Sequence, residues 1–369
     1  MADHLAEAME YCPDLSRRTE RLRRLYSRRG LDEVFAIMNI PRQALVRFAE
    51  LHPAGPCGYP DPEERAQFWD SYWKESAGVF DDRVPAAPLS ELDQGLYGGL
   101  VGGEVRFVSA TEGGWISSMV PPLLSDWKEL DSLRLDEHGL WAQRYRHILD
   151  VFVSASRGRF GISHFILIDS LNFVFELLGA TRTYMSLDEE PERVHQAIDF
   201  AFDLNAWVQD RFFQSVPLVQ GGTCSGMGSW VPGRVVTESM DPFHMTSAEY
   251  LAKWGIEPIE RILSRYDGGL VHIHGNGRHL LETACRIRGL RGIYLGDDHG
   301  FPAAFDVLPE LRRRAGDMPL IVSVPFPAFC EKLKTGGLVG GVLYTVTGVP
   351  DAGTANRTME QVRKYVPAR

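Results

Sequence analysis

Residues 269–295 read GLVHIHGNGRHLLETACRIRGLRGIYL, and this stretch decides the fold. It predicts a strand over Gly269–His274, a helix over 277–287 and a second strand over Leu290–Leu295, with glycines at the junctions. A strand, a helix and a further strand in this order give two parallel strands joined by a right-handed crossover. The sequence therefore indicates an α/β fold at this point of the chain.

The same alternation continues on both sides of this stretch. Further strands are predicted over Glu33–Ile40, Val84–Leu89, Glu104–Ala110, Phe160–Ile168, Val216–Gly221, Leu320–Val324 and Gly340–Val346. Helices are predicted over 138–157, 170–179, 191–215, 247–265, 304–314, 327–335 and 353–364, and Gly98–Gly103 reads as a glycine-rich turn. About eight parallel strands favour a closed barrel over an open sheet. The predicted fold is a (β/α)8 TIM barrel over residues 81–369, with an N-terminal helical extension over residues 1–80 packed on it.

Composition limits the classes of function. The chain has 369 residues, a net charge of -10 and 24% charged residues, which is typical of a globular protein. The acidic balance argues against a nucleic-acid partner. No apolar run reaches the roughly 18 residues of a membrane span, and the first residues lack the pattern of a signal peptide. Five cysteines without a Cys-x-x-Cys pair indicate free thiols and a cytoplasmic protein.

Two histidines at the end of the strand 269–274 are the strongest site signal. Side chains two residues apart in a strand point to the same face, so His272 and His274 project together. Neutral imidazoles on a rigid strand suit zinc, which needs a third protein ligand. Asp241, His244, Cys224 and Asp297 are the candidates for that ligand, and the sequence does not choose among them. The alternative is a hydrogen-bonded histidine pair at the rim of a pocket.

Acidic residues at other predicted strand ends complete the candidate site. Asp241 and His244 precede a helix and are expected to bind substrate if they do not hold metal. Asp169 follows the strand 160–168, which makes it a further substrate-binding candidate. Asp297 and Asp298 are adjacent, so one of them needs a raised pKa or a cationic partner. We predict Asp297 to transfer protons and Asp298 to bind substrate, against the alternative that both shape a turn.

Several motifs together resemble the uroporphyrinogen decarboxylase superfamily. They are Phe-Glu-Leu-Leu-Gly at 175–179, Leu-Asp-Glu-Glu-Pro-Glu-Arg-Val-His at 187–195, Ser-Ala-Glu-Tyr at 247–250 with Glu-Pro at 257–258, and His-Ile-His-Gly-Asn at 272–276. The resemblance covers roughly residues 80–365 and is strongest over 160–300. It implies a (β/α)8 barrel, in agreement with the alternation of strands and helices.

One activity that the resemblance implies is zinc-dependent methyl transfer involving corrinoid proteins. In that branch zinc is held by a His-x-Cys-Gly motif. His272 matches its first ligand, and His274 stands where the motif has cysteine. Our first interpretation is therefore that the protein is a metal-assisted methyltransferase, which uses zinc and acts on a corrinoid (cobalamin) or a methylated small molecule. In this interpretation Asp93 or Asp297 would transfer protons. The expected assembly is a homodimer.

The second implied activity is cofactor-free decarboxylation of a tetrapyrrole or another carboxylated substrate. The stretch Glu91-Leu-Asp-Gln94 places Asp93 on the key aspartate of that branch. Pro41-Arg-Gln-Ala44 is similar to its substrate-binding motif, so Arg42 would hold substrate carboxylates. A third interpretation is that the protein binds a corrinoid or tetrapyrrole without catalysing a reaction.

Overall fold

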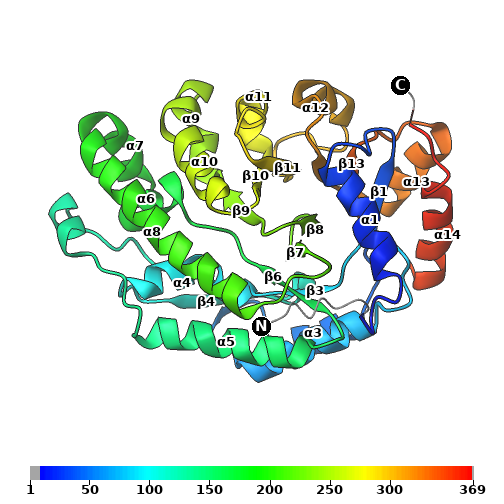
Figure 1. Ribbon diagram of the computed structural model, residues 1–369, viewed down its shortest axis with the longest axis horizontal. Helices are drawn as coiled ribbons and strands as arrows, with labels where there is room; N and C mark the ends of the chain where they lie inside the picture. The colour runs from blue at the N-terminus through cyan, green and yellow to red at the C-terminus, as the bar shows by residue number, and fades with distance from the viewer. Residues whose placement is uncertain (1–8, 368–369) are drawn as a thin grey trace.

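The computed structural model describes residues 9–367, apart from the side chain of Glu112, as a mixed α/β fold. Its helices are α1 (Leu15–Tyr26), α2 (Gln43–Leu51), α3 (Pro62–Lys74), α4 (Asp93–Leu100), α5 (Leu140–Ser156), α6 (Ser170–Leu178), α7 (Ala180–Glu189), α8 (Pro191–Ser215), α9 (Ala248–Trp254), α10 (Ile256–Arg265), α11 (Leu281–Ala284), α12 (Leu308–Ala315), α13 (Phe326–Thr335) and α14 (Ala352–Val362). Most of them form an outer layer around the strands, from α3 and α5 through α8 to α12 and α14 (Figure 1). None of these helices is long and apolar enough to cross a bilayer.

The main sheet has six strands, and all of its pairings are parallel. In spatial order they are β1 (Val34–Met38), β13 (Val342–Thr347), β12 (Leu320–Pro325), β11 (Leu290–Leu295), β10 (Gly269–Ile273) and β9 (Val236–Ser239). Every residue of β1 and β10 is buried, which is typical of a parallel sheet covered on both faces. From β9 to β13 the neighbours in space are also neighbours along the chain, as the strand–helix–strand repeat requires.

Two smaller sheets accompany the main one. Parallel pairing joins β3 (Ala86–Pro88), β6 (Gly161–His164) and β7 (Gly222–Ser225), and β7 forms an antiparallel hairpin with β8 (Ser229–Pro232). An antiparallel sheet contains β2 (Gly55–Cys57), β4 (Arg106–Ala110) and β5 (Trp115–Met119). The strand predicted over 104–110 is present as β4, but it belongs to this antiparallel sheet and not to the parallel set.

Backbone hydrogen bonds link the ends of the two parallel sheets. Leu167, just after β6, forms an isolated parallel bridge with Glu238 of β9, and its N–H donates to Thr237 O at 2.8 Å. At the other end, the N–H of Asp82 donates to the carbonyl of Ala36 in β1 at 3.0 Å. Within residues 9–367 the strand ladders do not form a closed ring, so strand pairing does not establish the predicted closed barrel.

The described part of the predicted N-terminal extension, residues 9–80, is not separate from the parallel sheet. Within them, β1 pairs with β13 in the main sheet. Helix α1 buries Leu22 and Leu25 in a cluster with Leu270, Ile321 and Leu343, each the second residue of its strand. This helix therefore covers the amino ends of the strands. Helix α1 does not cover the opposite edge of the sheet, where the carboxyl ends of the strands lie, and a functional site can form at that edge.

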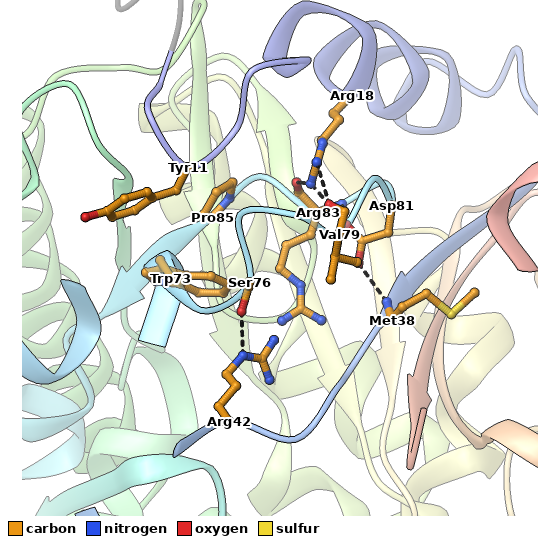
Figure 2. A pocket seen from close by; sticks show the side chains of 10 residues that line it. All are labelled: Tyr11, Arg18, Met38, Arg42, Trp73, Ser76, Val79, Asp81, Arg83 and Pro85. Atoms are coloured by element: carbon orange, nitrogen blue, oxygen red, sulfur yellow. Dashed lines mark hydrogen bonds and ion pairs between the residues drawn. The ribbon is translucent and has the colours of Figure 1, made fainter. Parts of the chain in front are cut away.

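Two aspartates use their side chains to bond the free edge of β1. Asp81 accepts the N–H of Met38 at 2.7 Å, and Asp82 accepts the N–H of Ala36 at 2.9 Å. Arg18 of α1 reaches down to this segment and donates to Asp81 at 3.1 Å (Figure 2). Because Arg18 and Asp81 are both almost completely buried, each supplies the charge that the other needs. The ion pair thus ties α1 to the edge of the sheet.

Helix boundaries agree with the sequence where the apolar period is strong. The helix predicted over 191–215 is confirmed as α8. The helix predicted over 247–265 is divided at Gly255 into α9 and α10. The glycine-rich segment at 98–103 is partly helical, because α4 extends to Leu100. Gly98 is needed there because a Cβ atom would lie 2.3 Å from Val120.

Candidate metal centre

His272 and His274 lie on one face of the chain at the carboxyl end of β10, as the alternation of the strand predicts. Val271 and Ile273 alternate with them and are completely buried in the core. The two imidazole rings are 4.8 Å apart between centroids. His272 is buried, and His274 is half-buried. The strand therefore presents two neighbouring ring systems at the edge of the sheet.

Asp241 completes the cluster from the neighbouring strand. It begins the 3-10 helix η4 (Asp241–Met245), which follows β9, and β9 is paired with β10. Its Oδ1 lies 2.9 Å from Nε2 of His272 and 3.7 Å from Nε2 of His274. One ligand atom from each of the three residues lies within 4.8 Å of the others. Partial burial acts to raise the pKa of Asp241, but the His272 hydrogen bond and the neighbouring histidines hold it below its usual range.

Two imidazoles and one carboxylate form a donor set that suits a divalent transition metal. Zinc binds such donors at about 2.0–2.2 Å, so two donors of a tetrahedral ion are about 3.3 Å apart. Two of the three donor separations, 2.9 and 3.7 Å, lie on either side of that value, and all three donor atoms lie within 4.8 Å of one another. Three protein ligands leave one position open for a substrate. Fe(II) uses the same donor set in other proteins.

Asp298, from the loop after β11, orients His274. Its Oδ1 lies 2.9 Å from Nδ1 of His274, and its Oδ2 accepts the N–H of Asn276 at 3.3 Å. A proton on Nδ1 leaves the lone pair of Nε2 directed towards Asp241. Burial acts to raise the pKa of Asp298, yet the hydrogen bonds from His274 and Asn276 hold it below its usual range. Asp298, predicted to bind substrate, is thus placed to orient His274, a candidate metal ligand.

This contact gives a testable expectation for Asp298→Ala. Loss of the carboxylate frees the His274 ring to rotate or change tautomer, and we expect metal affinity to fall by about tenfold to a hundredfold. Competition with a chromophoric zinc chelator measures the change. The exposed Asp306, changed to alanine, is the matched control and should keep full affinity. Equal affinity in both variants would contradict the supporting role of Asp298.

His244 stands beside the cluster without belonging to the set of three ligands. Its Nδ1 is 3.7 Å from Oδ1 of Asp241, and its ring centroid is 5.5 Å from that of His274. Burial lowers the pKa of His244 to about 4, despite the nearby Asp241, so its imidazole is neutral at pH 7. A Cβ atom on Gly277 would lie 2.1 Å from the His244 ring, so a residue with a side chain would clash with the ring at this position. His244 therefore forms a neutral wall of the site.

The structure does not support Cys224 as a third ligand. It lies in β7 and is packed in the apolar cluster that α1 covers, at the amino ends of the strands. Burial raises the pKa of its thiol to about 12, so the sulfur stays protonated. The other interpretation of this cysteine from the sequence, a small buried thiol, is confirmed.

Asp297 is engaged in an ion pair away from the histidines. It accepts from Arg278 at 2.9 Å and from the N–H of Ala304 at 2.7 Å. The expectation that one of the adjacent aspartates has a cationic partner is confirmed, and that partner is Arg278. The two contacts hold the loop after β11. They give Asp297 a structural position, whereas the sequence suggested proton transfer.

Asp93, at the start of α4, lies close enough to the cluster for the charge of Asp241 to act on it. Burial raises the pKa of Asp93 to about 7, against the hydrogen bond from Gln94, and the charge of Asp241 adds to the rise. Asp93 lines a cavity of about 280 Å³ together with His164 and Trp115. Near neutral pH this carboxyl can therefore take up and release a proton beside the candidate site.

Two predicted substrate-binding residues are placed elsewhere. Asp169 is completely buried, and its carboxyl has no hydrogen-bond partner among the described residues, so a substrate cannot reach it. Arg42 is buried as well: it donates to Ser76 and Ile40, and its guanidinium lies 4.1 Å from the centroid of the Tyr72 ring. Figure 2 shows Arg42 joined to Ser76. Short motifs do not show this burial and internal packing, and a role of either residue in substrate binding stays a prediction.

Sequence reasoning missed β9 and Glu176. The strand predicted over 216–221 is a turn ahead of β7, and β9 takes the place beside β10. The β-branched run Val235-Val236-Thr237 was the available signal for β9. Glu176, on α6, was treated only as part of a motif. The structure buries its carboxyl in the wall of a cavity that Asp241 also lines.

Comparisons with known proteins bear on the fold. No family model and no curated protein matches the chain. Among solved structures, a methyltransferase from Methanosarcina mazei is similar over 94% of this chain and 98% of its own, with a TM-score of 0.57 and 12% sequence identity. At this identity the likeness shows the fold alone. The chain therefore shares the α/β fold of that structure over nearly its whole length.

Proposed function

We propose that this protein is a metal-dependent methyltransferase built on a (β/α)8 barrel of the uroporphyrinogen decarboxylase superfamily. The barrel would consist of β1, β3, β6 and β9–β13, with the bonds of Leu167 and Asp82 across its two gaps. The similarity to a methyltransferase over 94% of the chain supports the fold. The observation that carries the chemistry is the cluster of Asp241, His272 and His274 at the carboxyl ends of parallel strands, where the active sites of such barrels lie.

In this proposal the three residues hold one divalent ion, with zinc as our choice. Zinc would supply a Lewis acid that makes a methyl acceptor easier to deprotonate. Asp298 keeps Nε2 of His274 free of a proton on the side of the ion. The carboxylate of Asp241 offsets part of the ion's charge, and the buried neutral ring of His244 keeps water from one side.

Asp93 is the residue that we assign to proton transfer, as the general base for the methyl acceptor. A pKa of about 7 matches that task at neutral pH. The same value weighs against the decarboxylase alternative. That reaction needs an ionised aspartate to stabilise a cationic intermediate, and a carboxyl with a pKa of about 7 is half neutral at pH 7.

The pH profile of kcat/KM tests this assignment. Protonated Asp93 cannot act as a base, so the rate should rise as the pH passes through about 7. Asp93→Asn should lose that inflection and about 10²–10⁴-fold of the rate while keeping its metal. Asp306→Asn is the control and should keep the wild-type profile. An unchanged inflection in Asp93→Asn would remove the base role.

A corrinoid is one candidate methyl donor, and a small methylated molecule is the other. The zinc-loaded protein, incubated with methylcobalamin and 2-mercaptoethanol, should change the visible spectrum of the corrinoid and produce the methylated thiol. His272→Ala should do neither. No change with methylcobalamin would remove the corrinoid part of the proposal, and absence of bound metal would remove the whole.

A further inference from the structure

A second cavity, of about 250 Å³, adjoins the candidate metal centre. Its wall includes Asp241, which also belongs to the metal cluster, and Glu176, Phe175 and Tyr184 from α6 and α7. The volume is slightly below the range of about 300–1,000 Å³ typical of pockets for drug-sized ligands. The cavity therefore suits a small molecule placed directly beside the cluster.

The Glu176 carboxyl has no protein partner. The residue is only 9% exposed, and neither carboxyl oxygen has a hydrogen-bond partner among the described residues. The nearby Asn172 donates instead to Glu238 and to the carbonyl of Ser239. Burying a carboxyl without a partner is costly. A cationic or hydrogen-bonding ligand in the cavity would supply the missing partner.

The cavity is acidic. No lysine or arginine is among the described residues that line it. Burial raises the pKa of Glu176 well above its usual range, and the charge of Asp93 adds to this effect. A bound cation would favour the ionised form of Glu176, since opposite charges lower the pKa of a carboxyl. An anionic ligand would instead meet the Glu176 carboxyl, with no lysine or arginine among the described lining residues to compensate it.

Two aromatic side chains, Phe175 and Tyr184, line the same cavity. Phe175 and Tyr184 are 6.3 Å apart between centroids and meet edge to face. The hydroxyl of Tyr184 donates to the carbonyl of Pro242 at 2.8 Å, which holds its ring in place. Aromatic faces attract cations, and quaternary ammonium groups are recognised by such rings. The two aromatic rings and the unpaired Glu176 carboxyl are together complementary to an ammonium ion that carries alkyl groups.

We propose that this cavity binds a small alkylammonium cation, with Glu176 as its counter-charge and Phe175 and Tyr184 as its aromatic walls. The consequence for catalysis rests on the proposed function: a methylated ammonium would be the methyl donor and a thiolate the acceptor. In that step the C–N bond breaks and its electron pair stays on the amine, while a lone pair of the thiolate forms the C–S bond. One cation and one anion thus give two neutral products.

Calorimetric titration of the zinc-loaded full chain tests the proposal, with choline chloride as the probe and 3,3-dimethylbutan-1-ol as its neutral isostere. We expect choline to bind at least about tenfold more tightly than the isostere. Glu176→Gln keeps the shape of the side chain and should weaken choline binding by about tenfold to a hundredfold. Tyr184→Leu should weaken it by about threefold to thirtyfold. Glu189→Gln, an exposed site on α7, is the matched control and should change nothing.

Three results would overturn the cation site: equal affinity for choline and the isostere, full affinity in Glu176→Gln, or no choline binding to the folded wild-type protein. Thermal unfolding of each variant confirms that it is folded. The two proposals fail separately. A protein that holds zinc and demethylates methylcobalamin but ignores choline refutes this site alone. A protein that binds choline in the manner described but holds no metal refutes the methyltransferase alone.

Discussion

His272→Ala is expected to leave less than about 0.1 equivalent of metal per chain, against about one in the wild-type protein. The substitution removes one of three ligands and the atom nearest to Asp241, at 2.9 Å. The ligands that remain are the exposed carboxylate of Asp241 and the half-buried ring of His274, which together cannot hold the ion against buffer. Plasma mass spectrometry for zinc and iron after purification without chelators gives the content, and methyl transfer should be lost with the metal.

His299→Ala is the matched control for this experiment. His299 is an exposed histidine in the loop that contains Asp298, so its loss alters the histidine count but not the cluster. Its metal content should equal that of the wild-type protein. Metal retained in His272→Ala, or missing from the wild-type protein, would show that the three residues are a hydrogen-bonded cluster and not a metal centre.

Asp81→Ala is expected to lower the free energy of unfolding by about 3–5 kcal/mol. The change leaves the buried guanidinium of Arg18 with the partly exposed Asp14 but without its buried counter-charge, and it leaves the N–H of Met38 without its acceptor. The loss also loosens the edge of β1, where side chains replace a strand ladder. Urea unfolding followed by circular dichroism measures the effect.

An exposed ion pair supplies the comparison for Asp81→Ala. Asp317 lies 2.9 Å from Arg28, and both side chains are largely open to solvent. Asp317→Ala should therefore cost no more than about 1 kcal/mol. A loss below about 1 kcal/mol for Asp81→Ala as well would mean that the Arg18 contact is not what holds α1 to the sheet.

The candidate site was partly visible in the sequence. The placement of His272 and His274 on one face follows from the two-residue period of a strand, which is a local property. The strand itself was predicted over 269–274 and is found over Gly269–Ile273. The helix over 191–215 was equally clear, because Pro191 begins it and apolar residues recur at the helical period.

The third member of the cluster needed the tertiary structure. The sequence did not choose among Asp241, His244, Cys224 and Asp297, because all four are separated from His272 by 25 to 48 residues of sequence. Pairing of β9 with β10 brings Asp241 to the histidines, and burial in β7 takes Cys224 to the other end of the strands. The sequence missed β9, so it had no means of making that choice.

The sequence by itself determined that strands and helices alternate and that two imidazole side chains project from the same face of one strand. Both features depend on residues within a few positions of each other. Only the tertiary structure decided that Asp241 joins them, that Asp297 is paired with Arg278, and that Glu176 and Asp93 have raised pKa values. Distances between distant segments and exclusion of water set these properties, and neither is encoded in a short motif.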